Sequence, residues 1–312
     1  MAGSGDSTSE KTSEKTSEKT GEKSTRHRSA FTRVPASVVL LGLLSRLLPN
    51  DFLRTFVFLN LVAKPRRFFR TLINSFYRME HIYTVLGEFS KSYKGQFSVL
   101  EFGVASGYTF TKMLYATHYL KVSNRFTVHG FDSFEGMHKT DVREDKDIVT
   151  DDNWVVGQFK SSKEELESYC GSKYSNFELH KGMFDDTLTP ALLEKFEREP
   201  PVLVWIDCDY YSSARSVMEK LIPVLPNGCV IYFDEPEFNY GSRFTGETRL
   251  IHEINSGVLG DQIELVLDPE LSLNTRRIYR FINAAQDARL EPYRKINHRE
   301  FGRKRGNDSP LP

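Results

Sequence analysis

Two apolar runs that each stop at acidic residues set the strongest limit on how this chain can fold. Residues 202–206 and 229–233 are continuously apolar, and acids follow both runs: Asp207 and Asp209 after the first, Asp234 and Glu235 after the second. Continuous apolar runs of this length are typical of parallel strands that are buried on both faces. Ligands in open α/β sheets bind beyond the carboxyl ends of such strands. Carboxylates gathered at one rim repel each other, so the pattern indicates a bound cation or an acid/base group there.

Strand and helix patterns alternate through the middle of the chain. Besides the two runs above, we expect strands at 97–103, 126–132 and 177–181, and helices at 72–90, 109–119, 162–170, 189–197, 212–222 and 247–256. This alternation predicts a doubly wound, mostly parallel α/β sheet with helices on both faces. The last two predicted strands, 263–267 and 277–282, have no helix between them. We therefore expect them to form an antiparallel edge.

The 312 residues divide into four predicted segments. Residues 1–28 repeat a Thr-Ser-Glu-Lys motif with balanced charge and no apolar face, which predicts a disordered low-complexity tail. Residues 29–71 form an apolar and basic helical region, 72–285 form the folded α/β domain, and 286–312 form a basic C-terminal tail.

The apolar stretch 35–63 has two interpretations. Arg46 interrupts it and Pro49 ends its first part, so it falls short of the roughly 20 apolar residues of a membrane-spanning helix. We favour amphipathic helices that cover the core or form a homodimer contact, because buried helices of this length are common. The alternative is a peripheral membrane contact through residues 35–70. That segment ends in a basic patch made of Lys64, Arg66, Arg67 and Arg70.

Composition narrows the classes of partner and compartment. The formal net charge is zero, so nothing in the overall charge indicates a nucleic-acid partner. The three cysteines, Cys170, Cys208 and Cys229, show no zinc-ligand spacing and indicate a reducing environment. No cleavable signal peptide is visible. We therefore expect a cytoplasmic protein, with membrane association as the alternative for residues 35–70.

The turns after the first two strands predict a nucleoside site. The first strand ends in the sequence Glu101-Phe-Gly103-Val-Ala-Ser-Gly107, and glycines there let the backbone approach a ligand closely. No G-x-G-x-x-G or P-loop motif occurs, and the acid before the glycines suits a cationic amino group better than a pyrophosphate. Asp132 ends the second strand, where an acid accepts both hydroxyls of a ribose. The alternative is that Asp132 caps the following turn. Together the two turns fit an adenosine joined to an amino acid.

Read together, these motifs resemble the class I S-adenosylmethionine-dependent methyltransferases and, more narrowly, the macrocin O-methyltransferase family, which methylates sugar hydroxyls. The resemblance covers roughly residues 75–257 and implies a Rossmann-like fold, with the methyltransferase domain at 72–285. The matching stretches are Arg78-Met-Glu80, Glu101-Phe-Gly103-Val, Gly130-Phe-Asp132-Ser-Phe-Glu135-Gly136-Met, Trp154 with Gly157 and Phe159, Lys181-Gly182-Met-Phe184-Asp-Asp-Thr187-Leu, Ile206-Asp207-Cys-Asp209-Tyr-Tyr-Ser-Ser and Phe233-Asp234-Glu235.

The resemblance also implies roles for single residues. It implies Asp209 as the general base and three magnesium ligands, which are Asp207, Asp234 and Glu235. It implies an S-adenosylmethionine site built from Glu101, Gly103, Ala105, Ser106, Gly107, Asp132, Ser133, Phe184, Asp185 and Asp207. Two positions depart from the family pattern: Cys208 replaces a glycine, and Glu235 replaces a third aspartate and is followed by proline.

Four other residues have weaker signals. His138 follows the predicted ribose turn and is a candidate to face the substrate, and Trp154 either closes over the bound molecules or packs in the core. We place His129 in the core and Glu247 on an exposed face of the helix at 247–256.

The expected chemistry follows from this residue set. A sugar hydroxyl is a poor nucleophile, and a magnesium ion lowers its pKa and orients it, while binding places it in line with the methyl group. We predict an S-adenosylmethionine-dependent, magnesium-assisted O-methyltransferase whose small-molecule acceptor is a sugar or a related polar metabolite. One alternative is a non-catalytic nucleotide-binding scaffold with the same fold. The other is a magnesium-dependent nucleotide-sugar or phosphate enzyme, against which the missing phosphate loop counts.

Overall fold

The computed structural model describes residues 81–150, 153–269, 271–272 and 277–292. All of them belong to one unit, residues 69–312, and a separate unit of residues 1–68 lies outside the described part. The predicted tail at 1–28, the apolar and basic region at 29–71 and most of the basic tail at 286–312 therefore fall outside it as well. The bounds proposed for these segments stay predictions.

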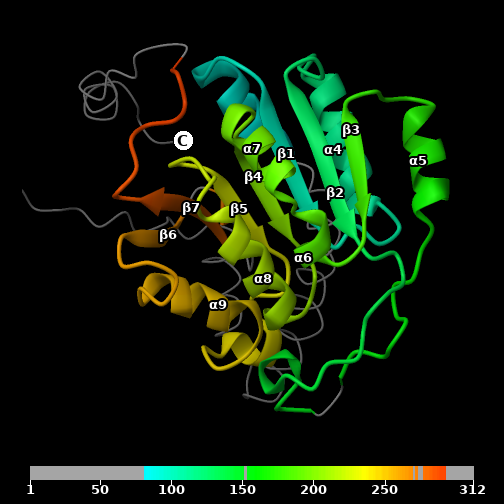
Figure 1. Cartoon of the computed structure of the whole chain (residues 1–312), viewed down its shortest axis with the longest axis vertical. Coiled ribbons are helices and arrows are strands. Elements are labelled where there is room, and N and C mark those ends of the chain that lie inside the picture. Colours follow the sequence, from blue (N-terminus) through cyan, green and yellow to red (C-terminus); the bar gives the residue numbers. More distant parts are fainter. Residues whose placement is uncertain (1–80, 151–152, 270, 273–276, 293–312) are drawn as a thin grey trace, which may run out of the picture. The chain divides into compact units, whose positions relative to one another are not determined.

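Seven strands form one mixed sheet in the order β3-β2-β1-β4-β5-β7-β6 (Figure 1). The first five run parallel, whereas β7 pairs antiparallel with both β5 and β6. This arrangement confirms the predicted α/β fold, which is the Rossmann-like fold of class I methyltransferases, and its antiparallel edge. The strands are β1 (Phe97–Phe102), β2 (Phe126–Asp132), β3 (Phe177–Lys181), β4 (Pro201–Ile206), β5 (Val230–Phe233), β6 (Ile263–Leu267) and β7 (Ile278–Asn283).

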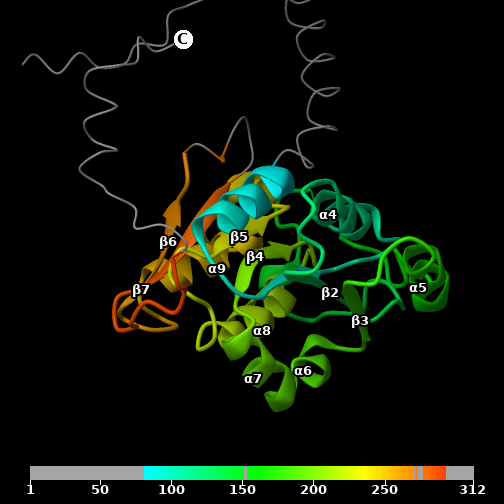
Figure 2. The ribbon, with the colours of Figure 1, turned by 90° about the horizontal axis from the view of Figure 1, so that it is seen from above.

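Helices cover both faces of the sheet. Figure 2 shows α4 on one side of the strands and α6, α7 and α8 on the other. Helical residues 81–92, α4 (Tyr108–Tyr119) and α5 (Lys163–Gly171) contribute to one core; α6 (Phe184–Thr187), α7 (Pro190–Arg198), α8 (Tyr211–Leu221) and α9 (Gly246–Asn255) border the other. Two short 3-10 helices, η2 (Arg143–Asp145) and η3 (Phe238–Gly241), lie in the connecting loops. Across the part of the chain that the structure describes, no helix has both the length and the apolar character needed to cross a membrane.

The two cores explain why the strands are apolar without interruption. Along β4, Leu203 and Trp205 belong to the first core, whereas Val204 and Ile206 belong to the second. Successive side chains of a strand point to opposite faces, so a sheet covered on both faces needs apolar residues at every position. Aromatic stacking reinforces the first core, where Trp205 packs on Tyr232 at 3.5 Å between ring centroids.

The carboxyl ends of β1 and β4 meet at the point where the chain changes direction across the sheet. The main-chain N–H of Asp207 donates to the carbonyl of Phe102 over 2.8 Å. Gly103 has a φ of +90°, and a Cβ atom on it would lie 1.8 Å from the Asp207 carbonyl oxygen. In the structure this glycine lets the turn after β1 approach Asp207, directly after β4; its predicted close approach to a ligand stays a prediction. The turn after β1 and the acids after β4 are thereby fixed to each other.

We predict that Gly103→Ala destabilises the domain by about 2 kcal/mol or more, because alanine disfavours a positive φ and its methyl group would overlap the Asp207 carbonyl. Urea unfolding followed by circular dichroism measures the change in the free energy of unfolding. Gly171→Ala is the matched control: Gly171 lies at the end of α5, and nothing lies within 4 Å of its added Cβ. The control should be neutral or stabilising by up to about 1 kcal/mol. Equal stabilities for the two variants would show that the β1–β4 contact tolerates a side chain.

Candidate functional site

A cavity of about 310 Å³ lies at the carboxyl ends of the five parallel strands. This is the edge of an α/β sheet where ligands bind, and the volume is at the small end of the range for ligand pockets. Most of the predicted cofactor residues line it, namely Glu101, Gly103, Ala105, Ser106, Asp132, Ser133, Phe184 and Asp207. Gly107 and Asp185 are the exceptions. Gly107 instead precedes α4 with a φ of +82°, and its missing Cβ leaves room for Leu166.

Asp132 joins the turns that follow β1 and β2. Its Oδ2 accepts a hydrogen bond from the Ala105 N–H at 2.8 Å, and its Oδ1 accepts one from the Phe134 N–H at 2.6 Å. The capping role that we weighed as the alternative is therefore present in the structure. A carboxylate has about four acceptor positions, so each oxygen can still accept a second hydrogen bond from a ligand in the cavity.

The turn after β3 forms an aromatic and apolar wall. Gly182, Met183 and Phe184 line the cavity, and the Phe184 ring packs edge-on against Phe102 at 5.4 Å. Asp185, which we grouped with Phe184, turns away to α8. Its Oδ1 accepts a hydrogen bond from Ser216 Oγ at 2.7 Å and lies 3.5 Å from Lys220 Nζ.

Four carboxylates form the opposite end of the cavity, as the two apolar runs predicted. They are Asp207, Asp209, Asp234 and Glu235. The Tyr232 hydroxyl donates to Asp234 Oδ1 at 2.8 Å. Asp209 has a φ of +62°, a left-handed conformation that costs energy for a non-glycine residue. Burial raises the pKa of Asp209 to about 7, and the negative charges of Glu235 and Asp234 add to the effect.

The donor chemistry at this rim fits magnesium, because carboxylate oxygens are the hard ligands that this ion prefers. In this structure, however, the ligand atoms of the three predicted residues are too far apart to share one ion. Among the described residues, the groups with three ligand atoms within 4.8 Å of one another do not include Asp207, Asp234 and Glu235. Sharing one ion would draw these carboxylates closer together, and the charge of the ion would offset their mutual repulsion.

Glu247 is a fifth acid at this rim that our sequence prediction misplaced. We expected it on an exposed helix face, but it is 1% exposed. Its Oε2 accepts a hydrogen bond from the Glu235 N–H at 2.9 Å, and its Oε1 is buried without a hydrogen-bond partner in the described structure. Burial raises the pKa of Glu247 well above its usual value, and the nearby acids raise it further. The helical spacing of Glu247 with buried Leu250 and Ile254 is the signal that could have placed it.

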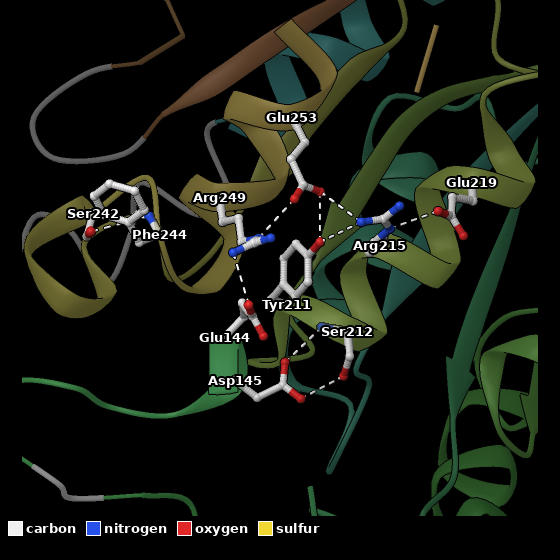
Figure 3. Close-up of polar contacts among 10 residues, drawn as sticks. All are labelled: Glu144, Asp145, Tyr211, Ser212, Arg215, Glu219, Ser242, Phe244, Arg249 and Glu253. Carbon is white, nitrogen blue, oxygen red and sulfur yellow. Dashed lines mark hydrogen bonds and ion pairs between the residues drawn. The ribbon is translucent and has the colours of Figure 1, made fainter. Parts of the chain in front are cut away.

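The loop after β2 is held against α8 and α9 by polar contacts (Figure 3). Asp145 is buried and accepts hydrogen bonds from both the N–H and the Oγ of Ser212, at 2.8 and 2.7 Å, in the first turn of α8. Asp145 thereby caps the first turn of α8 from the loop. Arg249 links the loop to α9, because its guanidinium contacts Glu144 at 3.0 Å and Glu253 at 2.9 Å.

Two loop residues complete the mouth of the cavity. His138 and Trp154 both line it. The His138 ring lies edge-on to Tyr210 at 5.0 Å, and the Tyr210 hydroxyl donates to the His138 carbonyl at 3.0 Å. The Trp154 ring packs against Phe159 at 5.8 Å. Both residues therefore line the same cavity as the four carboxylates.

Comparison with known proteins identifies the domain. Residues 100–235 match the family model described as a methyltransferase domain, and no curated protein sequence matches the chain. The crystal structure of CalS11, a calicheamicin methyltransferase, aligns at a TM-score of 0.51 with 22% identity, covering 79% of this chain and 93% of that one. The O-methyltransferase NovP aligns at 0.43 with 18% identity over 65% of this chain and 79% of that one.

A third solved structure is MycE in complex with Mg, SAH and mycinamycin VI. It aligns at a TM-score of 0.33 with 15% identity, covering 65% of this chain and 46% of that one. The likeness to CalS11 supports the fold, and the family model spans the strand ends that build the cavity. Residues 100–235 therefore match a methyltransferase domain, and the sheet that contains them has the Rossmann-like fold of class I methyltransferases.

Proposed function

We propose that this methyltransferase transfers its methyl group to a hydroxyl oxygen of a sugar or a related polar metabolite, with magnesium at the acidic rim. The observation that carries the proposal is the placement of four carboxylates at the end of the cavity that adjoins the cofactor turns. An acceptor with a readily alkylated nitrogen or sulfur needs no such concentration of negative charge. A hydroxyl must lose its proton, so it needs a base and a group that stabilises the resulting oxyanion.

The cofactor half of the cavity matches the three chemical parts of S-adenosylmethionine. Glu101 lines the cavity as a buried acid and supplies the negative charge that the amino group of the methionyl part requires. Asp132 offers its remaining acceptor positions to the ribose hydroxyls. Met183 and Phe184 provide an apolar surface for the adenine ring.

The acceptor half is organised around Asp209. Asp209 lines the cavity directly after β4, and its raised pKa suits a group that takes a proton near neutral pH. Asp207, Asp234 and Glu235 would hold the magnesium ion. When bound, the ion lowers the pKa of the acceptor hydroxyl and orients it. Asp209 then accepts the hydroxyl proton as the oxygen attacks the methyl carbon and the carbon–sulfur bond breaks, leaving S-adenosylhomocysteine.

The direct test is an acceptor screen with labelled S-adenosylmethionine, run on the full chain with and without magnesium over a panel of sugars and other polyhydroxylated metabolites. Transfer of label to a hydroxyl that depends on magnesium supports the proposal. Transfer only to nitrogen or sulfur acceptors would contradict it.

We predict that Asp132→Ala weakens the binding of S-adenosylhomocysteine by about 10-fold or more, because hydrogen bonds to a charged acceptor contribute about 1.5–3 kcal/mol. Isothermal titration calorimetry measures the dissociation constant. Asp185→Ala is the matched control, since this aspartate faces α8 rather than the cavity, and its affinity should stay at the wild-type value. An Asp132→Ala protein with unchanged affinity would remove this residue from the cofactor site.

We predict that Asp207→Ala abolishes turnover while the binding of S-adenosylhomocysteine largely survives, because the variant loses a proposed metal ligand but keeps both cofactor turns. Removing magnesium from the wild-type protein with a chelator should reproduce the loss, and adding the ion back should reverse it. Turnover that persists in the chelated wild-type protein would exclude a role for the metal.

We predict that Asp209→Asn lowers kcat by about 10² to 10⁴-fold, the usual range for loss of a general base, with a smaller effect on KM. Steady-state kinetics on the acceptor found in the screen measures both constants. Asp186→Asn serves as the control, because Asp186 lies in α6 and does not line the cavity. A kcat within a few fold of wild type would mean that another group takes the proton.

A further inference from the structure

A second cluster of potential metal ligands lies on the sheet, apart from the cavity. It consists of His129 in β2 and of Glu178 and His180 in β3, none of which lines the cavity described above. Among the residues that the structure describes, these three form the group whose ligand atoms all lie within 4.8 Å of one another. The proposed binding of cofactor and acceptor does not involve these three residues, so the cluster needs a separate explanation.

The register of the two strands brings the three side chains together. β2 and β3 are parallel, with His129 opposite Glu178 and Phe131 opposite His180. Residues opposite each other, and residues two apart on one strand, point to the same face of a sheet. All three side chains therefore lie on the face covered by α7, where the Phe196 ring packs edge-on against His129 at 5.2 Å.

The spacing of the ligand atoms matches the coordination sphere of a small ion. His129 Nδ1 and His180 Nε2 are 3.1 Å apart, and Glu178 Oε2 lies 3.6 Å from the first and 3.9 Å from the second. These three atoms form a triangle. The point in its plane that is equally far from all three lies about 2.1 Å from each atom, which is the length of a Zn–N or Zn–O bond.

Hydrogen bonds do not account for the position of every ligand atom in this cluster. The two imidazoles can share one proton across 3.1 Å, but Glu178 Oε2 is beyond hydrogen-bond distance of both rings. The other oxygen of the same carboxylate, Oε1, is held by Lys195 Nζ of α7. A lysine on one carboxylate oxygen fixes the direction of the other, which is how outer partners orient metal ligands.

We propose that His129, Glu178 and His180 bind a divalent first-row transition ion, with zinc as the best match to two imidazole nitrogens and one carboxylate oxygen. Three protein ligands leave a fourth position for water, and the site is reached from solvent because the His180 side chain is 19% exposed and that of Glu178 is 43% exposed. The ion would tie the edge strand β3 to β2, whose carboxyl end carries Asp132. The inference does not depend on the identity of the methyl acceptor.

The test is zinc binding by the full chain, freed of metal by chelation and titrated by calorimetry in excess magnesium, which occupies oxygen-ligand sites but competes poorly for imidazole. We expect one zinc per chain to be lost, or its dissociation constant raised by about 10-fold or more, in His180→Gln and in Glu178→Gln. These partly exposed positions avoid disturbing the buried His129. His118→Gln, an exposed histidine on α4, is the control and should bind as the wild type does.

Cobalt substitution gives an independent signature. A tetrahedral site with two imidazoles and a carboxylate should give visible cobalt bands without the near-ultraviolet band of a thiolate ligand, which separates this cluster from the free cysteines. Zinc should also raise the melting temperature of the wild type and of His118→Gln, but not that of His180→Gln. Equal zinc affinity in the wild type and His180→Gln, or a thiolate band in the wild type, would overturn the proposal.

Discussion

The contact between the end of β1 and the end of β4 is the constraint on which the rest of this site depends. Because Gly103 carries no side chain, the Asp207 carbonyl lies directly against it, and the Asp207 N–H is bonded to Phe102. After β1 the chain passes to α4 on one face, and after β4 it passes to α8 on the other. The segments that follow the two strands therefore diverge, and the cavity lies at the ends of the strands. This backbone contact thus fixes the turn after β1 relative to the acidic rim.

The acidic rim brings several carboxylates together, and their mutual repulsion and burial lower the stability of the folded state. Burial and neighbouring charges raise the pKa of Asp209 to about 7, and burial raises the pKa of Glu247 well above its usual value. Asp209 also adopts a positive φ. Residues with backbone strain or with strongly shifted pKa values cluster at functional sites. There a cation, a proton or a substrate can offset the repulsion between the like charges. The polar contacts of Asp145 and Arg249 brace the surrounding loop against α8 and α9 (Figure 3).

Much of the fold could be predicted because its elements are locally encoded. Every strand and helix expected between residues 97 and 285 is present in the structure, and its predicted first and last residues differ from the observed ones by at most one position. The strands could be recognised because burial on both faces demands unbroken apolar runs. The short elements α6, η2 and η3 were missed, since three or four residues carry no periodicity. Glu247 was misplaced because a glutamate on an amphipathic helix normally faces water, and only the packing of α9 against the rim encloses it.

The amino-acid sequence by itself determined the order of the elements, the two-sided burial of the sheet and the presence of acids at adjacent strand ends. These properties follow from side-chain periodicity and from chain order, both of which are local. Only the tertiary structure decided which polar groups meet: Asp132 bonds to two turns, Asp185 faces α8, and Asp145 caps α8. It also joined His129 to His180 across 51 residues of sequence. These contacts depend on strand register and on the packing of helices against the sheet. Both are set by the burial of many residues at once and cannot be predicted from a short stretch of sequence.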